Sequence, residues 1–341
     1  MSDERHPTET QTTPEVDNAS PALSRRETLR LLGVAGAAGL GASGLMAAQA
    51  QSAPAAAPTP AMPVGPMNGS GFYRQKVGDM TLTVVSDGTT TLDKVLPTWG
   101  ANPDRQELFA ATLAEYGVPA TNTVNHYNVV VVDTGNHRVL IDTGRGGSAG
   151  QLLSNLRRAG IFPGSIDTVF ITHGHGDHIG GLTMNGQPVF RRARHVMGRT
   201  DFEFWTTQAN PNAAVQANLI ALKDRFDLID PGAEIVPGLT TVSTPGHTVG
   251  HLSVRLSSAG QSAMVLGDAA GHFLLCLRFP GTYIGFDADG AQAAATRAQL
   301  FEMVTAEKML VTGYHFPFPA LGHLRRLSEG YEFEPVIWNW S

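Results

Sequence analysis

Three histidines and an aspartate within six residues constrain this chain more than any other feature. Residues 172–181 read Thr-His-Gly-His-Gly-Asp-His-Ile-Gly-Gly and directly follow the apolar run 169–171. Imidazole and carboxylate groups are ligands for Zn²⁺, Mn²⁺ and Fe²⁺. The glycines between them let the backbone turn tightly enough for several side chains to converge. The segment therefore predicts a metal site at the end of a buried strand.

Further metal-binding residue types stand just beyond other apolar runs. They are His247 after the run 239–243, Asp268 after the run 264–266, and His315 after the run 309–312. Residues beyond the carboxyl ends of neighbouring strands meet at one edge of a sheet, where ligand sites commonly form. We therefore expect these three residues to complete the site.

The composition of the 341-residue chain is that of a globular protein, with 42% hydrophobic and 16% charged residues. The formal net charge of −6 comes without a basic stripe, which argues against nucleic acid as a partner. The only cysteine, Cys276, excludes an internal disulfide and lies in an apolar run, as expected for a buried and inert thiol.

The first 50 residues are typical of an export signal. Arg25 and Arg26 precede the uncharged, Gly/Ala-rich stretch 31–48, which is too weakly apolar to be a stable membrane anchor. Paired arginines before such a stretch resemble a twin-arginine signal, and the small-x-small pattern predicts cleavage after Ala50. We therefore expect a periplasmic protein, with the Ala/Pro-rich residues 51–68 as a linker.

Residues 69–341 are expected to form one catalytic domain. Strands are predicted at 80–86, 127–133, 138–142, 168–171, 239–243, 252–256, 264–266 and 309–312. Helices are predicted at 148–159 with Ser148 as the cap, after the cap Asn212, and from Asp289-Gly290 to Ala306. Strands followed by a helix, approximately twice over, predict an αβ/βα sandwich with two sheets back to back.

The His-x-His-x-Asp-His spacing, followed by single His, Asp and His residues after later strands, resembles the metallo-β-lactamase superfamily of binuclear hydrolases. The resemblance covers most of residues 75–335 and implies a four-layer αβ/βα sandwich with two divalent ions. Zinc is the first expectation, and Mn, Fe and Co are alternatives. The ligands it implies are His173, His175 and His247 for one ion, Asp177, His178 and His315 for the other, and Asp268 as a bridge.

A narrower resemblance, to methyl parathion hydrolase and related lactonases and arylesterases, rests on residues 278–279, 286–289, 315–319 and 322–325. It implies an exported hydrolase of aryl esters and lactones, with phosphotriesters as a second substrate class, and a homodimer. A hydroxide held between the two ions would attack the substrate. Asp177 and Asp268 would handle the proton as catalytic residues.

Aromatic residues near the expected ligands indicate an apolar pocket for a small, neutral, ring-bearing ester or lactone. Trp205, Phe316 and Phe273 are the candidates for its walls. Two further residues, Asp142 at the end of a strand and His251 four residues after His247, are candidates for orienting the ligands through hydrogen bonds.

Several functions stay open at this point. Within the same fold, an acyl-homoserine lactone lactonase or a β-lactamase would use the same ligands. A nuclease-like member is disfavoured because the chain lacks a basic surface. A protein that binds metal without catalysis is the alternative outside enzymes.

Overall fold

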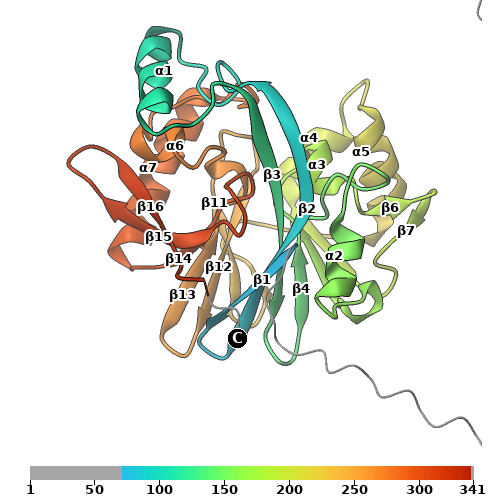
Figure 1. Ribbon diagram of the computed structural model, residues 1–341. Helices are drawn as coiled ribbons and strands as arrows, with labels where there is room; N and C mark the ends of the chain where they lie inside the picture. The colour runs from blue at the N-terminus through green and yellow to red at the C-terminus, as the bar shows by residue number, and fades with distance from the viewer. Residues whose placement is uncertain (1–70, 339–341) are drawn as a thin grey trace, which may run out of the picture. The chain divides into compact units, whose positions relative to one another are not determined.

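The computed structural model of the protein describes residues 71–338 (Figure 1). The predicted signal and linker, residues 1–68, lie outside the described residues. Between residues 71 and 338, no helix combines the length and the apolar character that crossing a bilayer requires.

Two seven-stranded mixed sheets form the centre of the described part (Figure 1). The first has the order β1-β2-β3-β4-β5-β8-β9 and the second has the order β10 to β16. The strands of the first sheet are β1 (Phe72–Val77), β2 (Met80–Lys94), β3 (Thr121–Asp133), β4 (Arg138–Ile141), β5 (Thr168–Ile171), β8 (Arg194–Gly198) and β9 (Phe226–Ile229). Those of the second are β10 (Glu234–Val236), β11 (Leu239–Ser243), β12 (Leu252–Ser258), β13 (Gln261–Val265), β14 (Leu310–Thr312), β15 (Leu321–Arg326) and β16 (Tyr331–Pro335). A small hairpin joins β6 (Thr183–Met184) and β7 (Gln187–Pro188).

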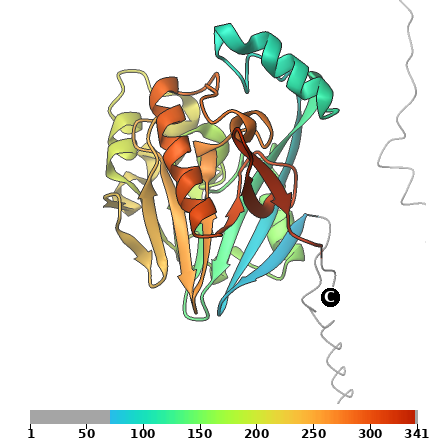
Figure 2. The same ribbon diagram turned by 90° about the vertical axis from the view of Figure 1, so that its left-hand side faces the viewer.

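Helices cover the outer faces of both sheets, which makes the four-layer sandwich that the sequence predicts (Figures 1 and 2). They are α1 (Gln106–Glu115), α2 (Leu152–Arg158), α3 (Gly176–Ile179), α4 (Arg199–Thr206), α5 (Ala213–Asn218), α6 (Leu275–Arg278) and α7 (Gly290–Ala306). Short 3-10 helices are η1 (Pro103–Arg105), η2 (Pro163–Ser165), η3 (Ile220–Arg225) and η4 (Gly267–Ala269). Figure 2 shows α7 lying along the outer face of the second sheet.

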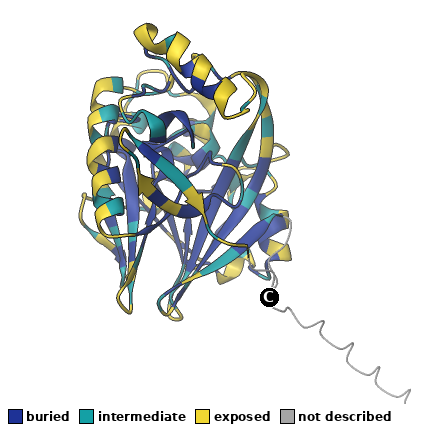
Figure 3. Ribbon diagram, turned by 60° about the vertical axis from the view of Figure 1, so that its left-hand side comes forward, coloured by how far each residue is buried: buried dark blue, intermediate teal, exposed yellow. Residues whose placement is uncertain are grey.

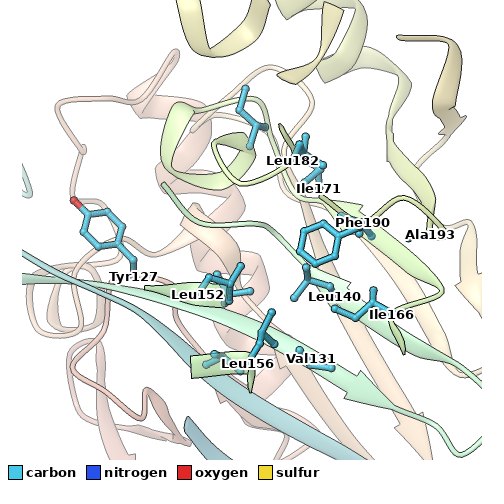
Figure 4. Close-up of a cluster of buried hydrophobic side chains, with 14 of the residues drawn as sticks. Tyr127, Val131, Leu140, Leu152, Leu156, Ile166, Ile171, Leu182, Phe190 and Ala193 are labelled. Atoms are coloured by element: carbon cyan, nitrogen blue, oxygen red, sulfur yellow. The ribbon is translucent and has the colours of Figure 1, made fainter. Parts of the chain in front are cut away.

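Apolar side chains hold these layers together. One buried cluster lies between the two sheets and includes Val84, Phe170 and Val254. A second joins the first sheet to the helices outside it, and Figure 4 shows part of it around Leu156 and Phe190. Figure 3 shows the buried positions concentrated on the strands, whereas the outer faces of the helices are exposed. This is the pattern that hydrophobic burial dictates for stacked layers.

Several elements agree closely with the sequence prediction. β5 and β11 have the predicted bounds, and the Asn212 and Asp289 side chains cap α5 and α7 by accepting hydrogen bonds from backbone N–H groups. The prediction of a helix from Ser148 is wrong, because α2 begins at Leu152. The Asp87 carboxylate, which comes from β2, accepts the N–H of Leu152 at 2.7 Å, and Leu152 is the first residue of α2.

Parallel pairing brings the important strand ends to one edge. β4 and β5 run parallel in the first sheet, and β13 and β14 run parallel in the second. The segments that follow β5, β11, β13 and β14 carry the residues singled out in the sequence. The two sheets therefore deliver these side chains to a common site.

Candidate metal centre

The two sheets bring all seven predicted ligands into two adjacent groups. In each group one ligand atom per residue lies within 4.8 Å of all the others. The groups are His173, His175, His247 and Asp268, and Asp177, His178 and His315. They coincide with the two sets that the sequence resemblance implies.

Asp268 lies where it can reach both groups. Its Oδ2 atom is 3.2 Å from His247 Nε2 in its own group. The same oxygen is 3.5 Å from His178 Nε2 and 3.3 Å from His315 Nε2 in the other. Asp177 faces only the second group, with its Oδ2 atom 3.5 Å from His315 Nε2. Asp268 is therefore placed as the shared carboxylate.

The donor set has unsatisfied polar atoms that a cation would satisfy. His178 Nε2 and Asp268 Oδ1 are buried, and neither has a hydrogen-bond partner among residues 71–338. His175 Nδ1 lies 3.0 Å from both His173 Nε2 and His247 Nε2, although one ring nitrogen cannot satisfy two others. Buried nitrogen and oxygen atoms without a hydrogen-bond partner reduce the stability of the fold unless a ligand binds them. The residues therefore fit divalent ions of the Zn²⁺, Mn²⁺, Fe²⁺ or Co²⁺ type.

Electrostatics favour the ligand forms of several of these groups. Burial lowers the pKa of His173 well below its usual value and lowers the pKa of His175 to about 4, so both rings are neutral. Burial opposes ionisation of Asp268, but His315 and His178 outweigh it and hold the pKa of this carboxyl well below its usual range. Neutral imidazoles and an ionised carboxylate are the forms that bind metal.

His178 and His247 shift in the opposite direction because acidic groups surround them. Burial disfavours their charged forms, but Asp268 and Asp142 raise the pKa of His178 well above its usual value. Hydrogen bonds to Asp268 and Asp287 likewise overcome burial and raise the pKa of His247 to about 9. The surroundings of these two rings therefore stabilise a positive charge at the ring nitrogens, and a divalent ion can supply that charge in place of a proton.

Asp142 orients two of the histidines, in the place where the sequence predicts an orienting group. Its Oδ2 atom lies 2.8 Å from His178 Nδ1. The Thr172 hydroxyl donates to the same carboxylate at 2.9 Å and lies 3.0 Å from His173 Nδ1. With both Nδ1 atoms engaged, the Nε2 atoms of His173 and His178 are left to face the centre.

His251 is fully buried and contacts the backbone that carries Asp268. Its Nε2 atom accepts the Asp268 N–H at 3.0 Å, and its Nδ1 atom lies 2.8 Å from the Thr244 hydroxyl. His251 therefore fixes the position of Asp268 without being a ligand itself.

Two aspartates with orienting contacts are absent from the sequence prediction. Asp287 Oδ1 lies 2.9 Å from His247 Nδ1. Asp201 is fully buried and accepts the N–H groups of Gly174 and Gly250 at 2.9 and 3.1 Å. Both act across a large sequence separation, and only the folded chain reveals them.

A cavity of about 400 Å³ opens beside the two groups. Its lining includes ligand side chains of both groups, aromatic rings and a few hydroxyl or amide groups. The Trp99 and Tyr127 rings stand 5.1 and 5.4 Å from the His315 ring. Phe286 is 61% exposed and therefore marks the mouth of the cavity. None of these three residues is among the predicted wall residues.

The three predicted wall residues have different positions. Trp205 does not line this cavity, but its ring lies 5.3 Å from that of His175 and so supports the first group. Phe316 is fully buried and packs edge-on against Phe333 in the core, so its prediction as a wall residue is wrong. Phe273 is also wrong as a wall of this cavity, because it lines a separate apolar pocket. Proximity to a ligand in sequence does not determine the side to which a ring points.

The chain is similar to known proteins over most of the described part. A solved structure described as hydrolase AbOPH in beta lactamase superfamily covers 80% of the chain with a TM-score of 0.72 and 27% identity, and 99% of that structure is matched. AidC, described as a dizinc quorum-quenching lactonase, covers 79% of the chain and is itself 98% matched, with a TM-score of 0.72. At 23% identity, AidC shows a common fold.

Curated relatives match a shorter region. An N-acyl homoserine lactonase of Bacillus sp is 26% identical over 163 residues, which are 47% of this chain. A beta-lactamase-like protein 2 homolog of Caenorhabditis elegans is 27% identical over 44% of the chain. The chain spans 60% of the length of the first relative and 46% of the second.

A family model decides the assignment. The model described as metallo-beta-lactamase superfamily matches residues 122–307, which is more than half of the chain and spans six of the seven candidate ligands. Fold, ligand groups and family model agree, and the chain belongs to the metallo-β-lactamase superfamily.

Proposed function

We propose that the protein is a binuclear metal-dependent hydrolase of lactones and aryl esters, with phosphotriesters as a second substrate class. The observation that carries the proposal is the position of Asp268, whose Oδ2 atom is within 3.5 Å of histidine nitrogens in both ligand groups. Two divalent ions held by these groups would activate a water molecule and polarise the substrate oxygen.

Two carboxylates of the chain, Asp268 and Asp177, have different roles in the proposed reaction. Asp268 lines the cavity but is almost fully buried among the histidines, so its main role is to hold the two ligand groups together. The Asp177 side chain is 29% exposed and lines the cavity, so it can reach a bound substrate. Of the two candidate catalytic carboxylates, Asp177 is therefore better placed than Asp268 to take a proton from the attacking water and pass it to the leaving group.

The cavity favours a neutral, ring-bearing substrate. Trp99, Tyr127 and Phe286 offer apolar faces, and no lysine or arginine occurs among the lining residues. β-Lactam antibiotics carry a carboxylate, which would find no basic side chain in this wall. An N-acyl homoserine lactone is neutral and is the second candidate, because curated relatives include N-acyl homoserine lactonases. The narrower resemblance to methyl parathion hydrolase supports the phosphotriester class.

The test is a substrate panel on metal-loaded and metal-stripped protein. Values of kcat/KM would be compared for dihydrocoumarin, phenyl acetate, paraoxon, an N-acyl homoserine lactone and a β-lactam. We expect lactone and ester hydrolysis that disappears on chelation and returns with Zn²⁺, Mn²⁺ or Co²⁺. Undiminished hydrolysis by the stripped protein would refute the metal-dependent mechanism.

Two variants separate catalysis from metal binding without catalysis. His175→Ala and Asp268→Ala should abolish hydrolysis while the far-ultraviolet circular dichroism stays native. His137→Ala is the matched control, because His137 lies in the exposed turn between β3 and β4, far from the ligands in the sheet. Hydrolysis that is equal in the variants and the control would show that this site does not catalyse it, and would favour a site that binds metal without catalysis.

A further inference from the structure

A second pocket, distinct from the metal cavity, combines aromatic side chains with an arginine in its wall. It has a volume of about 300 Å³, at the lower end of the range for ligand pockets, and shares no lining residue with the metal cavity. Its walls come from α6, the β15–β16 hairpin and the segment that follows His315. We call it the α6 pocket, after the helix that ends in its wall.

Five of the thirteen residues that line the α6 pocket are aromatic. They are Tyr116, Phe273, Phe318, Phe333 and Trp338. A pocket of this size with these rings in its wall fits a flat or extended apolar group. The walls alone, however, do not distinguish a neutral ligand from a charged one.

Arg278 introduces a positive charge that the described residues leave without a counter-ion. It is the last residue of α6, is half-buried, and lines the pocket. Its Nε atom is buried without a hydrogen-bond partner, and within residues 71–338 no carboxylate pairs with its guanidinium. Its guanidinium carbon lies 6.0 Å from the centre of the Tyr116 ring.

Glu332, the acidic residue that lines the same pocket, is not the counter-ion of Arg278. Glu332 forms a salt bridge with Arg325, which also contacts Glu334. A guanidinium has a fixed fork of donors that matches a carboxylate, and a buried donor without an acceptor is costly. The guanidinium of Arg278 lines the pocket and has no carboxylate partner among the described residues, so it can bind an acceptor that enters the pocket from outside.

We propose that the α6 pocket binds a small amphipathic carboxylate, such as a medium-chain or aryl-substituted acid. The apolar body would lie between the rings, and the carboxylate would accept hydrogen bonds from Arg278. Hydrolysis of esters and lactones releases acids of this class. The binding itself does not require the proposed hydrolase function.

The structure also connects this pocket to the metal centre. Phe273 stacks on His272 with ring centres 5.1 Å apart. His272 in turn lies 6.4 Å from Trp99, whose ring faces His315 at 5.1 Å. An acid bound in the α6 pocket therefore lies against a continuous row of rings that ends at a candidate ligand.

The test is calorimetric titration of the full chain with octanoate and with octanamide, which differ only in charge and donor groups. Metal-stripped protein is used so that the acid cannot bind to a metal ion. We expect octanoate to bind at least tenfold more tightly than octanamide. Equal affinity for acid and amide overturns the proposal.

Variants then place the binding site. Arg278→Gln should weaken octanoate binding at least tenfold. Arg326→Gln should leave it unchanged, because Arg326 belongs to the β15–β16 hairpin, pairs with Glu302 and does not line the pocket. Should Arg278→Gln fail to fold, Trp338→Ala decides, because this ring is 43% exposed and its loss removes one wall. Unchanged octanoate affinity in whichever of these two pocket variants is folded overturns the proposal. Because the readout is binding by stripped protein, this outcome is distinguishable from failure of the hydrolase proposal.

Discussion

Replacing Asp142 by asparagine isolates the role of one carboxylate in preparing the metal centre. Asp142 follows β4 in a left-handed conformation, with φ of 65°, and its side chain is buried. Its Oδ1 atom accepts the N–H of Thr172 at 2.9 Å, and its Oδ2 atom lies 2.8 Å from His178 Nδ1. Asparagine has the same shape and tolerates this backbone conformation, so the fold should survive.

The amide cannot satisfy both partners. In one orientation its NH₂ group faces the Thr172 N–H, and a donor opposes a donor. In the other it faces His178 Nδ1, which must then accept, so the proton moves to Nε2 and blocks the atom that faces Asp268. Losing such an orienting partner typically costs 10- to 100-fold in metal affinity, or about 1.4–2.7 kcal/mol.

Competition with a chromophoric chelator measures both metal affinities. We expect the site of Asp177, His178 and His315 to be weakened most. At a free metal concentration that the chelator holds between the wild-type and variant dissociation constants of this site, the variant should bind close to one ion where the wild type binds two. Asp133→Asn is the matched control, because Asp133 pairs with Arg138 at the partly exposed end of the neighbouring strand. Wild-type affinities for both ions in Asp142→Asn would refute the reasoning.

Three further changes test other parts of the chain. Burial lowers the pKa of His195 from 6.5 to about 4, so acid favours the unfolded chain, which takes up a proton that the fold excludes. When the pH falls from 8 to 5, the free energy of unfolding of the wild type should therefore drop by about 2 kcal/mol more than that of His195→Leu, as measured by urea unfolding. An equal drop in the two proteins would contradict this prediction. A Cβ atom at Gly174 would lie 2.2 Å from the Trp205 ring, so Gly174→Ala should cost about 1–3 kcal/mol in thermal unfolding. The cost should shrink in a Trp205→Ala background, and an undiminished cost there would exclude this clash. We also propose twin-arginine export, so lysine at both Arg25 and Arg26 should retain the protein in the cytoplasm on cell fractionation; normal export would exclude that signal.

The ligands could be predicted because two short-range rules apply to them. Four of them occupy the six residues 173–178, where the spacing alone carries the information. The other three stand beyond strands, and apolar runs locate strands well. His247 illustrates this, because β11 has the bounds that the sequence predicts.

The walls and the orienting groups could not be predicted because they come from distant parts of the chain. Trp99 lies in a connection between β2 and α1, which the sequence pattern does not mark, yet its ring faces His315. Asp287 and His247 are 40 positions apart, although their side chains are in contact. Phe316 follows His315 directly and still points into the core, because Gly313 leaves room for its ring there.

The candidate ligands and the cavity wall come from different parts of the fold, so the residues that bind metal differ from those that select the substrate. The ligands follow strands whose ends are fixed by hydrogen-bonded pairing, so they tolerate little displacement. Much of the cavity wall instead comes from the outer halves of β2 and β3, where Thr90, Leu92 and Asn125 lie beyond the inter-sheet core. Figure 1 shows these two strands extending past their neighbours towards α1. Substitutions there can reshape the cavity without moving a ligand, so substrate range should change more readily than metal binding.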